Sequence, residues 1–329
     1  MKKFDHLMIK LPEDFVIIDN TDISNTFGIY PDDRQINDYI DYGIILLDKP
    51  AGPTSHEVVA IVKKILSLKR AGHSGTLDPN VTGVLPIALS NSTKILASLL
   101  KSNKKYICKM INAKTFSLDL WNSKFQEYER EIYQMPPLKS NVVKKLRKRT
   151  IFQLKLIEMD ANDNILFEVT SEAGTYIRTL CIDLGRSIGS SSFMGELRRI
   201  QSGPFIENEL KSLHQLFDAW SIYQENKNEI VLREIIQPIE ILIQFNATVM
   251  IKTMYVNLVC HGVNILKKSI MGTTEFNENS LICLISSKHE LIGIGNALIN
   301  SSEIEKMNDD SIVIKPYKII MNRDLYPRF

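Results

Sequence analysis

Hydrophobic positions in the first third of the chain follow two different spacings, one typical of a strand and one typical of a helix. Residues 42–48 (YGIILLD) are almost continuously apolar and end at a Lys-Pro-Ala-Gly-Pro turn, which predicts a buried strand. Thr54 and Glu57 then have the spacing of a capping box, and apolar residues within 58–66 recur on one helical face. The pattern therefore predicts a strand, a turn and a helix in succession.

The same reading predicts further elements along the chain. We expect helices over 92–101, 176–188 and 193–200, and strands over 105–112 and 165–170. Because these elements do not alternate as regular βαβ units, the pattern favours an α+β fold on a mixed, largely antiparallel sheet. Past residue 247, short apolar runs separated by Gly, Asn and Ser predict a small β-rich domain. The expected domains are an extension over 1–40 packed on the small domain, a main domain over 41–246 and the small domain over 247–329.

Composition places the chain among soluble globular proteins. Its 329 residues are 44% hydrophobic and 24% charged. The four cysteines lie tens of residues apart without a C-x-x-C pair, so neither a zinc site nor a disulfide framework is expected. No run of eighteen apolar residues occurs, which argues against a membrane span. We expect a cytoplasmic protein without metal.

Charge is concentrated locally, although the net charge is only +2. Residues 139–149 (KSNVVKKLRKR) hold six basic side chains and no acidic one, and residues 94–109 hold five lysines, again without an acid. Such an excess suits the neutralisation of phosphates in nucleic acid. The alternative is an ordinary solvated charged face, and the charge pattern alone leaves both open.

One aspartate, Asp78, stands in a segment of restricted backbone, residues 71–89 (AGHSGTLDPNVTGVLPIAL). Pro79 disfavours a helical conformation for the residue before it, so the Asp78 carboxylate should project from a loop or a strand end. The glycines before and after it permit another backbone or a nucleic-acid strand to approach closely. Taken alone, Asp-Pro is also ordinary turn chemistry.

This segment resembles the active-site segment of the TruB and dyskerin family of pseudouridine synthases, whose catalytic aspartate lies in a G-T-L-D-P motif. The resemblance covers nearly the whole chain, because further family motifs occur in family order. They are GIILLDKPAGPTSHEV (43–58), KKYICKM (104–110), MPPLKSNVVKKLRKRTI (135–151), EAGTYIRTLCIDLG (172–185) and MGELRRIQSGPF (194–205). The tail over 249–329 resembles a PUA domain, and the chain looks archaeal within the dyskerin branch.

The resemblance implies isomerisation of uridine to pseudouridine in RNA, without a cofactor. It matches Asp78 to the catalytic residue, Tyr106 to the aromatic ring that stacks on an extruded uracil, and Arg178 to the partner that keeps the carboxylate ionised. Attack on the sugar, attack on the base and proton abstraction all stay open for Asp78. Without their motifs, a lone tyrosine would be read as half-buried packing and a lone surface arginine as solvated.

The resemblance also implies a set of residues that bind substrate RNA. His73 matches a residue that enters the RNA where the base leaves, and Lys49 with Pro50 matches a motif that supports the pocket. The basic segment matches a mobile loop that closes over RNA. The implied RNA-binding residues are His73, Tyr176, Lys49, Lys144, Lys145, Arg147, Lys148 and Arg149, with His261 and Gly262 in the PUA-like tail.

The leading hypothesis is therefore the catalytic subunit of an archaeal box H/ACA ribonucleoprotein. Its partners would be a guide RNA, substrate ribosomal RNA and small companion proteins. A second hypothesis is a guide-independent synthase that acts on the T-loop uridine of transfer RNA. A third, from another class, is a noncatalytic RNA-binding scaffold whose working part is the PUA-like domain.

Overall fold

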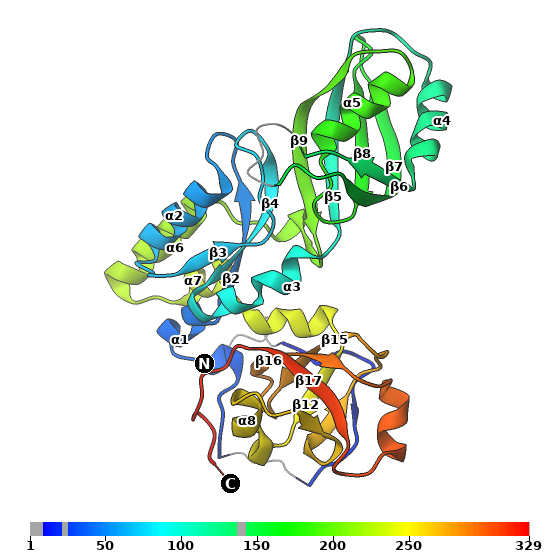
Figure 1. Ribbon diagram of the computed structural model, residues 1–329. Coiled ribbons are helices and arrows are strands. Elements are labelled where there is room, and N and C mark those ends of the chain that lie inside the picture. Colours follow the sequence, from blue (N-terminus) through cyan, green and yellow to red (C-terminus); the bar gives the residue numbers. More distant parts are fainter. Residues whose placement is uncertain (1–8, 22–25, 137–142, 329) are drawn as a thin grey trace. The chain divides into compact units, whose positions relative to one another are not determined.

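The computed structural model describes residues 9–21, 26–136 and 143–328 of the chain (Figure 1). Contacts divide the chain into two compact units, each assembled from separate stretches of sequence. The tail unit contains Met1–Ile44, Ala88–Ile95 and Asn228–Phe329, and the central unit contains Ile45–Ile87 and Leu96–Lys227. The domain limits predicted at residues 40 and 246 divide the chain along its sequence instead, and they stay predictions.

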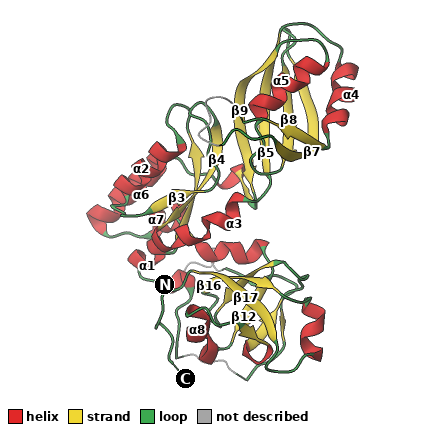
Figure 2. Cartoon of the chain, in the orientation of Figure 1, coloured by secondary structure: helices red, strands yellow, loops and turns green. Residues whose placement is uncertain are grey.

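The central unit is built on a mixed sheet (Figure 2). Strand β5 lies between β8 and β9 and is antiparallel to both, whereas β4 and β9 are parallel. The strand order is β2-β4-β9-β5-β8-β7-β6, with β3 on β4 and β10 on β9. The strands are β2 (Gly43–Lys49), β3 (Ala71–His73), β4 (Thr82–Leu89), β5 (Lys104–Asn112), β6 (Glu131–Gln134), β7 (Arg147–Met159), β8 (Ile165–Ser171), β9 (Ser192–Ser202) and β10 (Phe205–Ile206).

Three helices of the central unit begin after a residue whose side chain caps them, namely Thr54, Ser117 and Ser212. The predicted capping box is present, since Glu57 N donates to Thr54 Oγ1 at 3.1 Å and Thr54 N donates to Glu57 Oε2 at 2.7 Å. Apolar residues of α4 and α5 pack with the sheet in one core cluster, which includes Trp121, Phe167 and Leu180. The helices are α2 (Ser55–Ile65), α3 (Leu96–Leu100), α4 (Leu118–Tyr128), α5 (Ile177–Ser187) and α6 (Leu213–Asn226).

Two of the predicted helices need correction. The helix expected over 193–200 is wrong, because these residues belong to strand β9. A bulge at Gly195, where Lys109 pairs with Glu196 but Met110 pairs with Met194, brings Met194 and Leu197 against the same core. Their three-residue spacing therefore imitates a helical face. The helix expected over 92–101 is a 3-10 segment, Ser90–Ile95, followed by α3.

The tail unit is β-rich, as the sequence predicted. Its sheet has the order β1-β14-β12-β15-β16-β17-β13, so a strand of the amino-terminal residues pairs at one edge with β14. The strands are β1 (Val16–Ile17), β12 (Thr248–Ile251), β13 (Ile265–Leu266), β14 (Ile270–Thr273), β15 (Leu281–Ile285), β16 (Leu291–Ala297) and β17 (Ile312–Ile319), while β11 (Gln237–Pro238) pairs with the start of β2. The helices are α1 (Ile36–Asp41), α7 (Ile230–Ile235) and α8 (Thr253–Cys260). The predicted fold class is confirmed.

A buried ion pair joins amino-terminal and carboxyl-terminal stretches of the tail unit. Arg34 donates to both carboxylate oxygens of Glu240, at 3.0 and 2.6 Å, and the Glu240 side chain is fully buried. Glu240 Oε1 also accepts a hydrogen bond from the backbone of Leu291 at 3.0 Å. The pair is thus hydrogen-bonded on several sides, which a charge inside a protein requires.

All four cysteines carry free thiols and are buried. Burial raises the pKa of the Cys283 thiol to about 12, which disfavours its reactive thiolate form.

Within the described ranges, no helix is both long enough and apolar enough to cross a membrane.

Candidate active site

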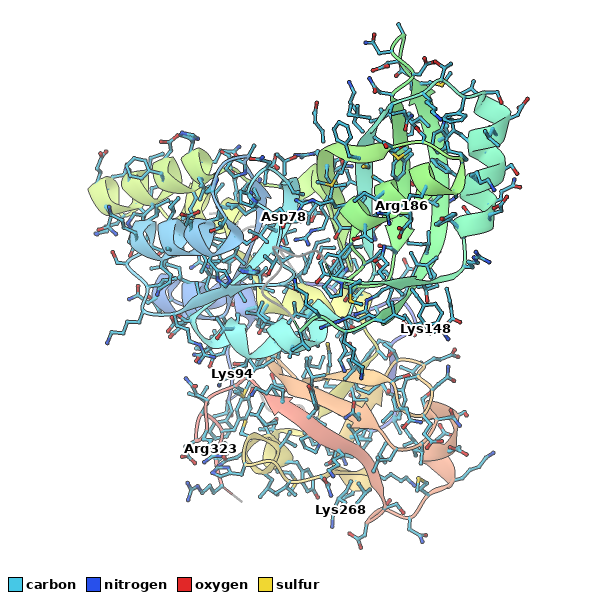
Figure 3. All side chains as sticks on the ribbon, turned by 45° about the horizontal axis from the view of Figure 1, so that its top comes forward. Asp78, Lys94, Lys148, Arg186, Lys268 and Arg323 are labelled. Carbon is cyan, nitrogen blue, oxygen red and sulfur yellow. The ribbon has the colours of Figure 1, made fainter. Side chains whose placement is uncertain are left out.

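Asp78, which is labelled in Figure 3, lies in the loop between β3 and β4. A buried lysine holds that loop in place. Lys49 is fully buried, and its ammonium donates to the carbonyl oxygens of Pro79 at 2.8 Å, Val81 at 3.0 Å and Pro50 at 2.8 Å. Burial lowers the pKa of Lys49, and the neighbouring Asp78 charge opposes that shift. In this position Lys49 supports the loop. Its burial does not fit the direct contact with RNA that the resemblance implies.

The other side of Asp78 is held by a serine that the motif analysis did not single out. Ser55 Oγ accepts a hydrogen bond from Leu77 N at 2.9 Å and donates to Leu77 O at 3.1 Å. Ser55 is the first residue of α2, so the helix anchors the residue directly before Asp78. Backbone on both sides of the carboxylate is therefore fixed while the carboxylate itself stays exposed.

Arg178 meets Asp78 across 100 residues of sequence. The Arg178 Nη2 and Asp78 Oδ2 atoms lie 2.5 Å apart, and the side chains are 42% and 54% exposed. Arg178 is the second residue of α5, so the helix start directs its guanidinium toward the loop. The predicted pairing is present, and it leaves a charged carboxylate that a ligand can reach.

The start of α5 is fixed by a glutamine that sequence reasoning missed. Gln134, at the end of β6, accepts a hydrogen bond from Tyr176 N at 2.9 Å and donates to Tyr176 O at 3.1 Å. A side-chain amide that pairs with both backbone groups of one residue holds that residue in a single orientation. Tyr176 is the N-cap residue of α5, two positions before Arg178, so Gln134 also helps to place the guanidinium.

Tyr106 of β5 lies in the same region and is nearly buried, with 8% of its surface exposed. It belongs to a core cluster that also contains Leu77, Val81 and Ile177. Leu77 precedes Asp78 and Ile177 precedes Arg178, so one apolar cluster links the three predicted pocket residues. The structure thus brings Asp78 and Arg178 into contact and places Tyr106 in the core cluster that contains the residue preceding each of them.

His73 ends β3 and packs against a second histidine. Its ring lies 4.9 Å from that of His56 in an edge-to-face arrangement, and its buried Nδ1 has no hydrogen-bond partner. Burial, together with the positive charges of His56 and Arg199, lowers the pKa of His73 to about 4. His73 is therefore neutral near pH 7.

The basic segment over 139–149 is only partly a loop. Residues 137–142, with Lys139, lie outside the described residues, and Lys144 and Lys145 are exposed. Correction is needed from Arg147 onward, because Arg147, Lys148 and Arg149 begin strand β7, which pairs with β6. The structure therefore places the end of the segment that the resemblance matched to a mobile loop in a paired strand.

Two of the strand cations already have acidic partners. Lys148 lies 2.6 Å from Glu131, and Arg149 lies 3.5 Å from Glu172. Because Lys148 and Glu131 are both more than half exposed, this pair contributes little to stability and can exchange its partner.

A second candidate site is a pocket of about 450 Å³ in the tail unit. His261 and Gly262, the two residues predicted to bind RNA in the tail, both line it. His261 Nδ1 lies 2.8 Å from Asn257 O, which orients the imidazole at the end of α8. The remaining lining residues are Lys94, Cys260, Ile319, Met321, Asn322 and Arg323 (Lys94 and Arg323 are labelled in Figure 3). A positively charged, partly apolar pocket suits a nucleotide base with its phosphate.

Metal chemistry finds no support in the described parts of the chain, where no group of three or more His, Cys, Asp or Glu could hold an ion. What the central unit offers is a solvent-accessible carboxylate, a guanidinium in contact with it and a tyrosine close by. These groups can stabilise or attack an electron-poor carbon and can move protons.

Family profiles account for most of the chain. The TruB family pseudouridylate synthase (N terminal domain) profile matches residues 63–177, and the tRNA pseudouridylate synthase B C-terminal domain profile matches 178–244. The DKCLD (NUC011) domain profile matches 3–59 and the PUA domain profile matches 247–320. The chain is 38% identical to the probable tRNA pseudouridine synthase B of Archaeoglobus fulgidus, over 96% of this chain and 97% of that protein.

The chain belongs to the TruB family of pseudouridine synthases. Within that family it is dyskerin-like and carries DKCLD and PUA domains. A second relative, the probable tRNA pseudouridine synthase B of Methanocaldococcus jannaschii, is 37% identical over 100% of this chain and 97% of that protein. As a pseudouridine synthase, the protein is an intramolecular isomerase that acts on RNA.

Solved structures agree over the full length of this pseudouridine synthase. The crystal structure of a Cbf5-Nop10-Gar1 complex contains a chain 38% identical, with a TM-score of 0.88, covering 98% of this chain and 97% of that one. A structure of an H/ACA RNP bound to a substrate RNA containing 2'-deoxyuridine contains a chain 37% identical, with a TM-score of 0.87, covering 97% and 98%.

Proposed function

We propose that this pseudouridine synthase is the catalytic subunit of an archaeal box H/ACA ribonucleoprotein and isomerises uridines of ribosomal RNA that a guide RNA selects. The observation that carries the proposal is the exposed Asp78 carboxylate in contact with Arg178. The full-length likeness to chains solved within H/ACA assemblies supports the particle, with a guide RNA and small companion proteins as partners. Four free thiols suit the cytoplasm as its location.

The proposed chemistry needs one ionised carboxylate beside the sugar and base of an extruded uridine. The guanidinium of Arg178 is charged at any physiological pH, so it keeps Asp78 ionised and aimed when the bound RNA excludes water. Tyr106 supplies the aromatic face for the extruded uracil. The C1'–N1 bond breaks, the base turns within the pocket, and C5 bonds to C1'. The C5 proton leaves and N1 takes up one proton, directly or by exchange with solvent, so the product is an isomer of uridine.

Residues around the carboxylate would bind the RNA itself. His73, neutral near pH 7, can enter the position that the extruded base vacates and stack there on its neighbours. Lys144, Lys145 and Arg147 would contact phosphates on one side, in a manner that weakens with salt. Tyr176 would contact the nucleotide next to the target.

The pocket of the tail unit would bind the guide RNA. His261 and Gly262 line it, and the positive φ of Gly262, +86°, leaves open space where a side chain would stand. Backbone can therefore approach a nucleotide closely at this turn. This arrangement favours recognition of RNA by shape and backbone, so that base pairing with the guide supplies the sequence specificity.

The test is reconstitution of the full chain with companion proteins, an H/ACA guide RNA and a ribosomal RNA fragment, followed by quantification of pseudouridine at the target. The wild type should modify the paired uridine, and omission of the guide should abolish the product. Full activity of Asp78→Asn would refute the role assigned to Asp78. Product formed equally well without the guide would refute the proposed particle.

A second candidate function is guide-independent modification of transfer RNA. The observation in its favour is the name of the curated relatives, which are described as probable tRNA pseudouridine synthase B. Incubation of the isolated chain with unmodified transfer RNA separates the two functions, because only a guide-independent enzyme forms product there. A noncatalytic scaffold is disfavoured, because the chain belongs to a family of pseudouridine synthases and has Asp78, Tyr106 and Arg178 at the matched positions.

A further inference from the structure

Arg199 is a buried arginine that the proposed chemistry does not use. It lies on β9, and only 1% of its surface is exposed. Its neighbour Arg198 faces two acids, donating to both oxygens of Asp48 at 2.9 and 3.2 Å and to Glu207 at 2.9 Å. No carboxylate within the described ranges forms an ion pair with Arg199. A buried cation without an acid is costly, so its position calls for a functional reason.

The guanidinium of Arg199 instead bonds neutral groups around the pocket. Nε donates to Val84 O at 2.7 Å and Nη2 donates to Gly75 O at 3.1 Å, and Arg199 pairs directly with Tyr106 across strands β9 and β5. Burial lowers the pKa of Arg199, and its interaction with Tyr106 opposes that shift. A guanidinium retains its charge even so, because its ordinary pKa is above 12.

Two glycines of the Asp78 segment lie directly against Arg199. Both have positive φ, +79° at Gly75 and +100° at Gly83. A Cβ atom at Gly75 would lie 3.0 Å from Arg199 Nη1, and one at Gly83 would lie 2.1 Å from Arg199 O. Arg199 therefore contacts the segment that carries Asp78 on both sides of the aspartate. Its guanidinium lies against Gly75, and its backbone lies against Gly83.

A bulge in β9 places Arg199 beside Tyr106. Lys105 pairs with Gln201, whereas the next residue, Tyr106, pairs with Arg199, so Ile200 is the extra residue. Directly paired residues of antiparallel strands project from the same face, which brings the guanidinium next to the phenol ring. Without the bulge, Ile200 would occupy the position opposite Tyr106 in place of Arg199.

We propose that Arg199 is a positioning residue for the isomerisation, which fixes the hydroxyl of Tyr106 and the Asp78 segment relative to each other. The inference rests on the proposed roles of Asp78 and Tyr106. An arginine suits this task because its planar group has five donors, so the two carbonyl bonds leave donors over that can face the Tyr106 hydroxyl. The geometry predicts that Arg199 raises the single-turnover rate of the enzyme–RNA complex and hardly changes the affinity for RNA. Part of this rate increase should depend on the Tyr106 hydroxyl.

The test uses the reconstituted particle with target RNA that carries tritium at C5 of uridine, under single-turnover conditions. Arg199→Met should lower the rate of tritium release about 10- to 100-fold, with RNA affinity within about twofold of wild type, because misplaced groups slow the bound complex. Arg199→Lys should recover part of the rate. In a Tyr106→Phe background, the same Arg199→Met change should cost at least about threefold less than it does in the wild type, because the share of the effect that passes through the Tyr106 hydroxyl is already lost.

Arg198→Met is the matched control, since it removes two ion pairs from the neighbouring position and leaves the Gly75 and Tyr106 contacts in place. Its rate should stay close to that of the wild type. Thermal unfolding identifies variants that fail to fold, and if Arg199→Met is one, Arg199→Lys in both backgrounds answers the question instead.

A wild-type rate in the Arg199 variants, or a loss of equal size with and without the Tyr106 hydroxyl, would overturn the inference. If the wild-type particle released no tritium from guide-selected RNA, that result would contradict the proposed substrate and not the role of Arg199. The same comparison of variants then proceeds on transfer RNA.

Discussion

Each unit of the molecule contains an arginine–carboxylate pair with nearly the same shortest contact distance in a very different environment. In the central unit, Arg178 and Asp78 lie 2.5 Å apart with side chains 42% and 54% exposed. In the tail unit, Arg34 and Glu240 lie 2.6 Å apart with side chains 8% and 0% exposed. Contact distance therefore does not distinguish them, and burial does.

The environments indicate what each pair is for. An exposed pair contributes about 0–1 kcal/mol to stability, so Asp78 and Arg178 are free to serve a ligand. Breaking a buried pair leaves a charge without compensation, at a cost of about 3–5 kcal/mol. Glu240 also accepts a backbone hydrogen bond from Leu291, so it joins distant stretches of the tail unit. We therefore assign the exposed pair to chemistry and the buried pair to folding.

Asp78→Asn should produce the largest effect on activity. The neutral amide has nearly the same shape but cannot act as a nucleophile or base, so the single-turnover rate should fall about 10⁴-fold. The midpoint of thermal unfolding should hardly move, because the pair is exposed. Pseudouridine yield and a melting curve on the same preparation test both halves, and a large drop in melting temperature would contradict the assignment.

Glu240→Gln should produce the opposite result. Removing the buried charge opposite Arg34 should lower the free energy of unfolding by about 3–5 kcal/mol. Urea denaturation followed by circular dichroism measures this change. At low temperature, the folded fraction of the Glu240→Gln variant should retain the wild-type catalytic rate per folded molecule. An Arg34→Met, Glu240→Met double variant should recover much of the lost stability. A single variant as stable as the wild type would show that the pair does not serve folding.

Arg178→Met should reduce the rate less than the loss of the carboxylate itself. The carboxylate remains but is no longer aimed, which should cost about 10²-fold in single-turnover rate. Arg178→Lys retains the positive charge but lacks the planar guanidinium, so its single-turnover rate should lie between the rates of the wild type and Arg178→Met. If Arg178→Met slowed the reaction as much as Asp78→Asn, the guanidinium would have to take a direct part in the chemistry.

Arg323→Ala should affect binding and leave chemistry unchanged. Arg323 lines the tail-unit pocket, so guide RNA affinity should fall roughly 3- to 10-fold and the slope of log affinity against log salt should flatten by about one. Filter binding over a salt series measures both. Lys268→Ala is a suitable control, because Lys268 pairs with Asp310 and does not line the pocket. Equal losses from both variants would argue for nonspecific charge.

The smallest expected effect concerns pH and His73. The pKa of His73 is lowered to about 4 in the folded protein from an ordinary 6.5, so the native state resists protonation. As pH falls from about 6.5 toward 4, the unfolded chain takes up the proton first, and stability is lost over that window. His73→Gln should make stability less dependent on pH there, measured by urea unfolding at several pH values. His214→Gln, at an exposed position, should not.

Sequence predicted the central unit well where local signals agree with the fold. The capping box at Thr54 and Glu57 exists as predicted, and the buried strand before it is β2. The contact between Asp78 and Arg178 was implied only by family resemblance, because no local pattern reveals that residues 100 positions apart touch.

The failures are places where tertiary structure changes the meaning of a local pattern. Bulges in β9 make apolar spacing look helical, so residues 193–200 were assigned to a helix, and the role of Arg199 could not be foreseen. The resemblance places Lys49 among the RNA-binding residues, whereas its ammonium donates to two carbonyl groups of the Asp78 loop and to the carbonyl group of Pro50. The role of Gln134 has no signature in the sequence, because its two hydrogen bonds to the backbone of Tyr176 depend only on how the chain folds.

The most direct measurement is a crystal structure of the Asp78→Asn particle with guide RNA and a target RNA that contains uridine. We predict that the target base is extruded, stacks on the ring of Tyr106 and places its C1' atom within contact distance of the residue 78 side chain, with Arg178 beside it. A target uridine seated against a different surface of the protein, with residue 78 facing only solvent, would contradict the account.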